Sequence, residues 1–190
     1  LKGIPSIISP DLLKILMEMG HGDELVIGDG NFPQIAKRLV REDGHTVPEL
    51  LEAILKLYPL DTYSDPVYIM QKVPGDNVET PIWKEFEAIT GKYTDKPLTQ
   101  IERFEFYERA KEAYAVVTSG ETALYANIII RKGVVVDKLR QCALQADSVR
   151  IGCALLLILS AFLSADEGGE TYAEIYSLLS AYARLPSFYR

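Results

Sequence analysis

A chain of 190 residues has the length of one domain, or of one domain with a small addition, and it can bury a core without disulfides or a metal. Its apolar fraction of 48% and charged fraction of 25% exclude wholesale disorder. The 20 basic and 27 acidic residues give a net charge of −7, which argues against nucleic acid or an anionic membrane as the main partner.

The two cysteines do not indicate a disulfide scaffold. Cys142 and Cys153 lie in a segment predicted to be helical, which separates them by roughly 16 Å, beyond disulfide reach. No cluster of metal ligands surrounds either of them, so we expect no metal. The first residues, LKGIPSIISPDLL, lack the basic start and long apolar stretch of a secretory signal, and we therefore expect a cytoplasmic protein.

Four helices are predicted before residue 138, and three of them carry start signals. Ser9 and Thr80 each precede a proline, and Thr46 with Glu49 forms a capping box. Glycine or proline follows each of these three segments. The helices are expected over residues 10–19, 49–58, 81–89 and 101–113.

Short segments rich in β-branched and aromatic residues alternate with these helices and predict strands over 24–29, 67–73, 114–119 and 127–136. This alternation favours an α/β fold in which a mixed sheet is covered by helices. The glycines near the first strand do not open a helix, so they do not form a phosphate-binding loop.

The composition changes near residue 138. Through Lys138 there are 16 basic and 22 acidic residues, whereas the remaining 52 residues contain only 4 and 5. Apolar residues recur every three and four positions over 139–163, and a capping box at Thr171 and Glu174 opens a second helix. We expect two parts, a domain over 1–138 and a helical hairpin over 139–190 that packs on the domain or on another subunit. The uncharged run 151–165 is too short for a membrane span.

Only His21 and His45 can supply an imidazole. His45 lies in a polar turn, where exposure to solvent explains it. His21 follows the first helix, and compensation of the negative helix end is the simplest explanation of its position. However, Gly20 and Gly22 flank it and would expose the ring, and Asp29 ends the following strand, at the edge where α/β folds place ligand groups.

Two further stretches combine polar and aromatic side chains. Arg103 and Tyr107 share a face of the predicted fourth helix, which also reads as an ordinary amphipathic helix. Tyr125 and Asn127 are two residues apart, so in an extended chain they point the same way and could grip sugar hydroxyls. An ordinary strand edge would show the same pattern.

The motifs MGHGDELVIGDGNFP, RLVREDG, PLDTY and IERFEFYERAKEAYAVVTSGETALYANIIIRKGV occur in the order found in the fucose mutarotase family, the sibling of the D-ribose pyranases. The resemblance runs from about Leu1 to Val135. It implies the family's fold and a cofactor-independent isomerase that interconverts the anomers of L-fucose in a decamer of two pentameric rings. Some residues of each site would come from a neighbouring subunit.

Carried over by motif, the resemblance implies two groups of site residues. The catalytic candidates are His21, the general acid/base of GHGDE, with Tyr107 and Tyr125. The sugar-binding candidates are Asp29, Asp61, Arg103 and Asn127.

The chain departs from the family pattern at two places. The segment 33–41 is about two residues shorter than usual, and the tail from Asp137 has no counterpart in the family, so it is a natural extension or an engineered fusion.

Two alternatives to the mutarotase function remain open. One is D-ribose pyranase activity, and the other is a non-enzymatic scaffold built on a mutarotase oligomer. The tail hypothesis predicts that Leu155→Asp with Ile158→Asp disrupts assembly but not activity.

Overall fold

The computed structural model describes residues 1–135 of the chain. The predictions for the C-terminal part lie outside the described residues. They are the domain boundary at 138, the hairpin over 139–190, its role in assembly and the spacing of the two cysteines.

A mixed six-stranded sheet forms the centre of the described part, with the strand order β2-β5-β1-β6-β3-β4. β1 and β2 pair in parallel with β5, and β3 pairs in parallel with β4. β6 lies antiparallel between β1 and β3 and joins the two parallel halves. The expected mixed α/β sheet is therefore confirmed. The strands are β1 (Glu24–Gly28), β2 (Leu39–Glu42), β3 (Val67–Met70), β4 (Thr99–Ile101), β5 (Ala115–Ser119) and β6 (Ile128–Arg131).

Four helices cover this sheet: α1 (Pro10–Glu18), α2 (Val47–Leu55), α3 (Ile82–Thr90) and α4 (Arg103–Glu112). The capping predictions for Ser9 and Thr46 are confirmed, because each side chain accepts a hydrogen bond from a backbone N–H of the first turn. The cap predicted at Thr80 is wrong, since Pro81 occupies the cap position without a side-chain hydrogen bond. Within residues 1–135, no helix is long and apolar enough to cross a membrane.

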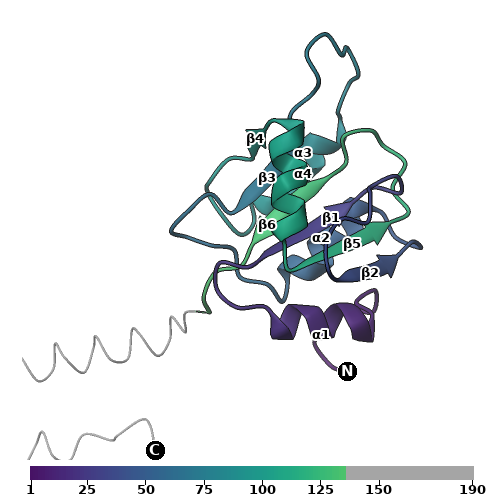
Figure 1. Cartoon of the computed structure of the whole chain (residues 1–190). Helices are drawn as coiled ribbons and strands as arrows, with labels where there is room; N and C mark the ends of the chain where they lie inside the picture. Colours follow the sequence, from purple (N-terminus) through teal and green to yellow (C-terminus); the bar gives the residue numbers. More distant parts are fainter. Residues whose placement is uncertain (136–190) are drawn as a thin grey trace, which may run out of the picture. The chain divides into compact units, whose positions relative to one another are not determined.

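Alternation along the strands divides the core into two layers. Leu25 and Ile27 of β1 point to the face covered by α1, α2 and α3, whereas Val26 points to the opposite face. α4 covers that opposite face with Phe106 and Ala110, and it crosses in front of the sheet in Figure 1. One face thus carries three helices, and the other carries one helix and the aromatic side chains near it.

Two strands were not predicted. Each lies at an edge of the sheet, and polar residues make up half of β2 (LVRE) and two of the three residues of β4 (TQI), so neither shows the apolar, β-branched composition of the other strands. The presence of β4 also delays the start of α4 to Arg103. β6 ends at Arg131, earlier than predicted, because its antiparallel partners β1 and β3 begin opposite Arg131 and Ile130. The following Gly133 packs against the backbone of Leu60. A Cβ at Gly133 would lie 2.4 Å from the Leu60 carbonyl oxygen.

Candidate active site

Strand β1 divides the seven candidate site residues into two groups. His21 precedes β1 and Asp29 follows it directly, so the two side chains start from opposite ends of the strand. At about 3.3 Å per residue, the five residues of β1 alone separate the two regions by roughly 16 Å. We refer to these two regions as the Asp29 end and the His21 end of β1. A site that needs both side chains is not formed within one copy of the chain.

At the Asp29 end, Asp29 and Asn127 are held together by two hydrogen bonds. The backbone N–H of Asp29 donates to Asn127 Oδ1, and Asn127 Nδ2 donates to Asp29 Oδ2, both at 2.9 Å. The antiparallel register of β1 and β6, with Ile27 opposite Ile128, brings the two residues together. Both are buried. Asp29 Oδ1 accepts from the backbone of Asn31, so the carboxylate has a fixed orientation.

Tyr125 lies in a turn before β6 and not in extended chain. Its φ of 57° is in the left-handed region, so the premise that it points the same way as Asn127 is wrong. Its hydroxyl donates to Asp76 Oδ2 at 2.5 Å and accepts from the backbone N–H of Val73 at 3.3 Å. Trp83 holds the turn by donating its indole N–H to the Tyr125 carbonyl at 3.0 Å. The hydrogen bond to Asp76 raises the pKa of the Tyr125 phenol.

Arg103 and Tyr107 come from the first half of α4. Arg103 is exposed and lies over the ring of Phe104, with 4.5 Å between the guanidinium carbon and the ring centroid. Tyr107 is half-buried, with its ring centroid 5.9 Å from that of Phe32. Phe32 in turn is hydrogen-bonded through its backbone to Asp29. Tyr107 therefore belongs to the Asp29 end. The amphipathic alternative holds for Phe106, which is buried, but not for Phe104, which is 61% exposed.

At the His21 end, the imidazole of His21 faces the buried carboxylate of Asp61. His21 Nε2 lies 3.4 Å from Asp61 Oδ1, and the His21 side chain is 47% exposed while that of Asp61 is 3% exposed. Ser64 donates to Asp61 Oδ2 at 2.5 Å, and the backbone N–H of Tyr63 donates to Oδ1 at 3.1 Å. Burial alone would raise the pKa of Asp61, but these hydrogen bonds together hold it well below its usual range. Within one chain, Asp61 is thus a partner of His21.

The helix-end explanation for His21 is not what the structure shows. The carbonyl groups near the end of α1 accept hydrogen bonds from Lys132 instead, at 2.7 Å for Leu16 and 2.5 Å for Met19. Burial lowers the pKa of Lys132. His21 is therefore free to face Asp61.

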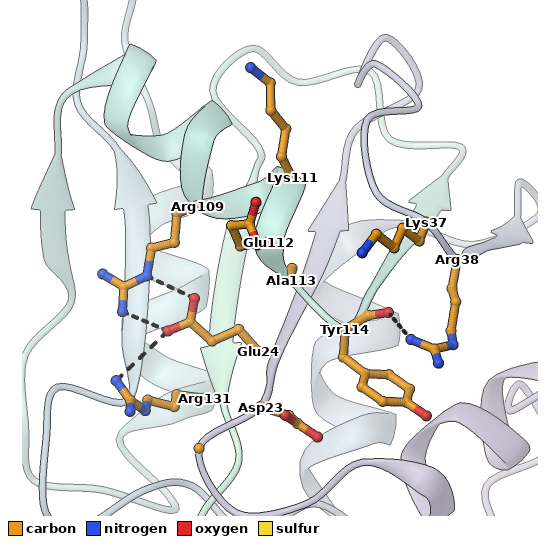
Figure 2. A pocket seen from close by; sticks show the side chains of 11 residues that line it. Asp23, Glu24, Lys37, Arg38, Arg109, Lys111, Glu112, Ala113, Tyr114 and Arg131 are labelled. Atoms are coloured by element: carbon orange, nitrogen blue, oxygen red, sulfur yellow. Dashed lines mark hydrogen bonds and ion pairs between the residues drawn. The ribbon is translucent and has the colours of Figure 1, made fainter.

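A polar cavity of about 370 Å³ lies beside Gly22 at the His21 end. Figure 2 shows Glu24 on one side of this cavity, between Arg109 and Arg131. Arg109 binds both carboxylate oxygens of Glu24, at 2.8 and 2.6 Å. Arg131 lies between two carboxylates, 4.0 Å from Glu24 Oε1 and 3.5 Å from Asp61 Oδ2. Figure 2 also shows Arg38 on the opposite side, where it donates to the Tyr114 carbonyl at 3.3 Å.

His45 lies in the turn that leads from β2 into α2, where its carbonyl accepts from the backbone N–H of Gly120 at 2.8 Å and its Nδ1 is 3.9 Å from Glu49. Among residues 1–135, no group of three or more acidic, histidine or cysteine side chains could hold a metal ion.

Sequence reasoning missed Asp76, Glu24 and Arg131. Asp76 is 49 residues from Tyr125, and Glu24 is 85 residues from Arg109. No spacing rule links residues that far apart. Glu24 and Arg131 meet through the antiparallel register of β1 with β6, which is known only from the folded sheet.

Comparison with known proteins gives matches along the described part of the chain. The chain is 53% identical over 144 residues to the fucose mutarotase of Homo sapiens, and the alignment covers 70% of this chain and 94% of that protein. A solved structure of FucU from Bifidobacterium longum is 55% identical, has a TM-score of 0.69, and covers 71% of this chain and 100% of that one.

The crystal structure of the fucose mutarotase from Streptococcus pneumoniae in complex with L-fucose is 50% identical with a TM-score of 0.68, covering 72% of this chain and 100% of the other. The sequence profile of the RbsD / FucU transport protein family matches residues 2–135. The chain belongs to the RbsD / FucU transport protein family.

Proposed function

We propose that this protein is an L-fucose mutarotase, an isomerase that interconverts α- and β-L-fucose by opening and closing the sugar ring without a cofactor. The observation that carries the proposal is the buried pair of Asp29 and Asn127, which presents fixed carboxylate and amide groups at the end of β1. Over the aligned 70–72% of this chain, about half of the residues are identical to those of proteins that bear this name, and the alignment covers nearly the whole length of those proteins.

Ring opening requires a proton to leave the anomeric hydroxyl and another to reach the ring oxygen, and closure on the other face reverses both transfers. A group that titrates near neutrality serves both directions, and histidine is the side chain with such an unperturbed pKa. We assign this role to His21. Tyr107 and Tyr125 can donate to or accept from a sugar oxygen without carrying charge at neutral pH.

The remaining candidates suit the binding of hydroxyl groups. Asp29 and Asn127 offer acceptors and donors whose orientation is already fixed, so little ordering entropy is lost when the sugar binds. Arg103 lies exposed at the start of α4, where it can donate to a further sugar oxygen. Asp61 contributes by holding His21, which is the partner closest to its carboxylate outside the 61–64 turn.

A complete site needs a second copy of the chain, because His21 and Asp29 stand at opposite ends of β1. We propose that the His21 end of one copy completes the Asp29 end of another, in the ring-shaped decamer that the family resemblance implies. Exposed apolar side chains occur at both regions and support such contacts. Tyr63 beside His21 is 79% exposed, and Leu124 beside Tyr125 is 57% exposed.

Saturation-transfer NMR on the anomeric protons tests the activity directly. We expect the full chain to accelerate exchange between α- and β-L-fucose over the rate in buffer alone, at neutral pH and without added metal. The same measurement with D-ribose tests the second hypothesis, since a pyranase exchanges pyranose with furanose forms. Acceleration for D-ribose alone would assign the chain to that activity. No acceleration for either sugar would leave the scaffold hypothesis.

A further inference from the structure

Five groups of alternating charge form a continuous series at the His21 end. The series runs from Arg109 through Glu24, Arg131 and Asp61 to His21, with no step longer than 4.0 Å. The two carboxylates are the least exposed members, at 12% for Glu24 and 3% for Asp61. Burying charges is costly unless they are paired, so each carboxylate depends on its cationic neighbours. Arg131 is the only member that touches both.

The backbone fixes Arg131 relative to Asp61 and to the loop that carries His21. The Arg131 carbonyl accepts from the backbone N–H of Asp61 at 3.1 Å. The next residue, Lys132, accepts from the N–H of Gly22 at 2.8 Å, directly beside His21. A Cβ at Gly22 would lie 3.7 Å from Arg131 Nη2, so the guanidinium reaches the His21 loop. The end of β6 thus holds guanidinium, carboxylate and imidazole in one arrangement.

Charge, more than hydrogen bonding, connects Arg131 to Asp61. Arg131 Nε is buried and makes no hydrogen bond within the described part of the chain, although it lies 3.5 Å from Asp61 Oδ2. The Asp61 oxygens already accept from Ser64 and from the Tyr63 backbone. The contribution of Arg131 is therefore a positive charge near the carboxylate and near the loop that carries His21.

We propose that Arg131 is a positioning residue for His21, which holds the ionised Asp61 carboxylate in place and sets the pH at which the imidazole exchanges its proton. This inference deepens the proposed function and rests on it for the catalytic role of His21. Arg131 acts through Asp61 and does not itself touch the reacting atoms.

The sign of the effect follows from the charges around His21. Asp61 faces the imidazole, and the Tyr63 ring packs edge-on at 5.8 Å without charge. Asp23 accepts from the Gly20 N–H, Lys132 donates to the Met19 carbonyl, and Arg131 reaches the His21 loop at Gly22. Negative neighbours favour a charged imidazolium and positive neighbours oppose it. Removing the Arg131 charge removes a repulsion and leaves Asp61 less neutralised. Both changes stabilise the imidazolium, so the proton is retained to higher pH.

Three variants test this assignment. Arg131→Gln removes the charge, Arg131→Lys keeps it, and Arg38→Gln removes a charge from the other side of the same cavity, where Arg38 contacts Tyr114. Glu24→Gln removes a negative charge from the series and should act with the opposite sign. The measurements are the NMR titration of the imidazole of His21, with His45 as internal reference, and the pH profile of L-fucose exchange.

We expect Arg131→Gln to move the titration midpoint of His21 to higher pH by on the order of half to one pH unit, and to move the acid limb of the pH profile to higher pH by the same amount. Arg131→Lys and Arg38→Gln should leave both near the parent values, and Glu24→Gln should lower them. Lower activity in Arg131→Gln with an unmoved midpoint would overturn the proposal and make Arg131 a packing residue. If Arg131→Gln does not fold, an unmoved or raised midpoint in Glu24→Gln overturns it.

Failure of the proposed function has a different signature. A parent chain that does not exchange L-fucose refutes the function, while the NMR titration of its variants still decides whether Arg131 controls the protonation of His21.

Discussion

The two ends of β1 carry side chains of different chemistry, although β1 pairs with β6 at both ends. At the Asp29 end, Asp29 and Asn127 hold each other through two hydrogen bonds of 2.9 Å. At the His21 end, the same antiparallel register sets Glu24 opposite Arg131 and starts the series of alternating charges that reaches His21. One end offers fixed hydrogen-bonding groups, and the other offers a titratable group in a charged setting.

We propose that Asp29 and Asn127 bind the sugar and that His21 transfers the proton, with Tyr107 and Tyr125 contributing from the Asp29 end. Fixed hydrogen-bonding groups discriminate hydroxyl patterns, because an unsuitable sugar leaves a buried group unpaired. A proton carrier instead needs a surrounding that stabilises both of its charge states. Substitutions at the two ends should therefore fail in different ways.

The largest effect is expected for His21→Ala. General acid–base groups contribute typically about 10²–10⁴-fold, and we expect exchange of L-fucose to fall within that range with the fold retained. Saturation-transfer NMR gives the rate, and circular dichroism checks the fold. His45→Ala is the matched control and should exchange at the parent rate. Equal rates for the two variants would remove His21 from the mechanism.

Asp61→Asn should lower stability in a manner that depends on pH. Because its pKa is depressed in the folded chain, the Asp61 carboxylate stabilises the fold fully above its ordinary pKa near 4, and this contribution shrinks progressively as the pH falls from that value through the lower pKa of the folded chain. We expect a loss of about 1–3 kcal/mol at pH 7 by urea unfolding, shrinking toward pH 3. The exposed Asp43→Asn should change little at either pH. A deficit that persists unchanged at pH 3 would contradict the ionised role of Asp61.

Two tyrosine variants sharpen the comparison between function and stability. Tyr125→Phe removes the hydrogen bond to Asp76, and we expect exchange of L-fucose to fall about tenfold with a stability change below about 1.5 kcal/mol.

Tyr58→Phe removes a buried hydroxyl that lies 3.3 Å from the carbonyls of Asp23 and Ile130. This variant should cost about 1 kcal/mol of stability with exchange of L-fucose preserved. Thermal unfolding and NMR exchange measure both quantities. The reverse pattern would make Tyr125 structural.

The sequence predicts most of what depends on local chemistry. The caps at Ser9 and Thr46 follow from hydrogen bonds between residues three apart, and the four central strands follow from their apolar composition. The edge strands β2 and β4 are not predicted, because half or more of their residues are polar.

The candidate site is less predictable, because its contacts depend on the assembled sheet. The seven candidate residues follow from family motifs. That they lie at two opposite ends of β1 follows only from the position of β1 in the folded sheet. The left-handed φ of Tyr125 also gives no sequence signal, since tyrosine rarely adopts it and the Trp83 contact that holds it is 42 residues away.

The central claim is that one sugar site takes His21 from one copy and Asp29 from another, and mixing two inactive variants tests it most directly. His21→Ala and Asp29→Ala are denatured together, refolded in equal amounts and assayed for L-fucose exchange by NMR. If the site is shared between copies, random assembly leaves about a quarter of the sites with both native residues, and about a quarter of the parent activity returns. If both residues act within one chain, the mixture stays as inactive as either variant alone, and the account is wrong.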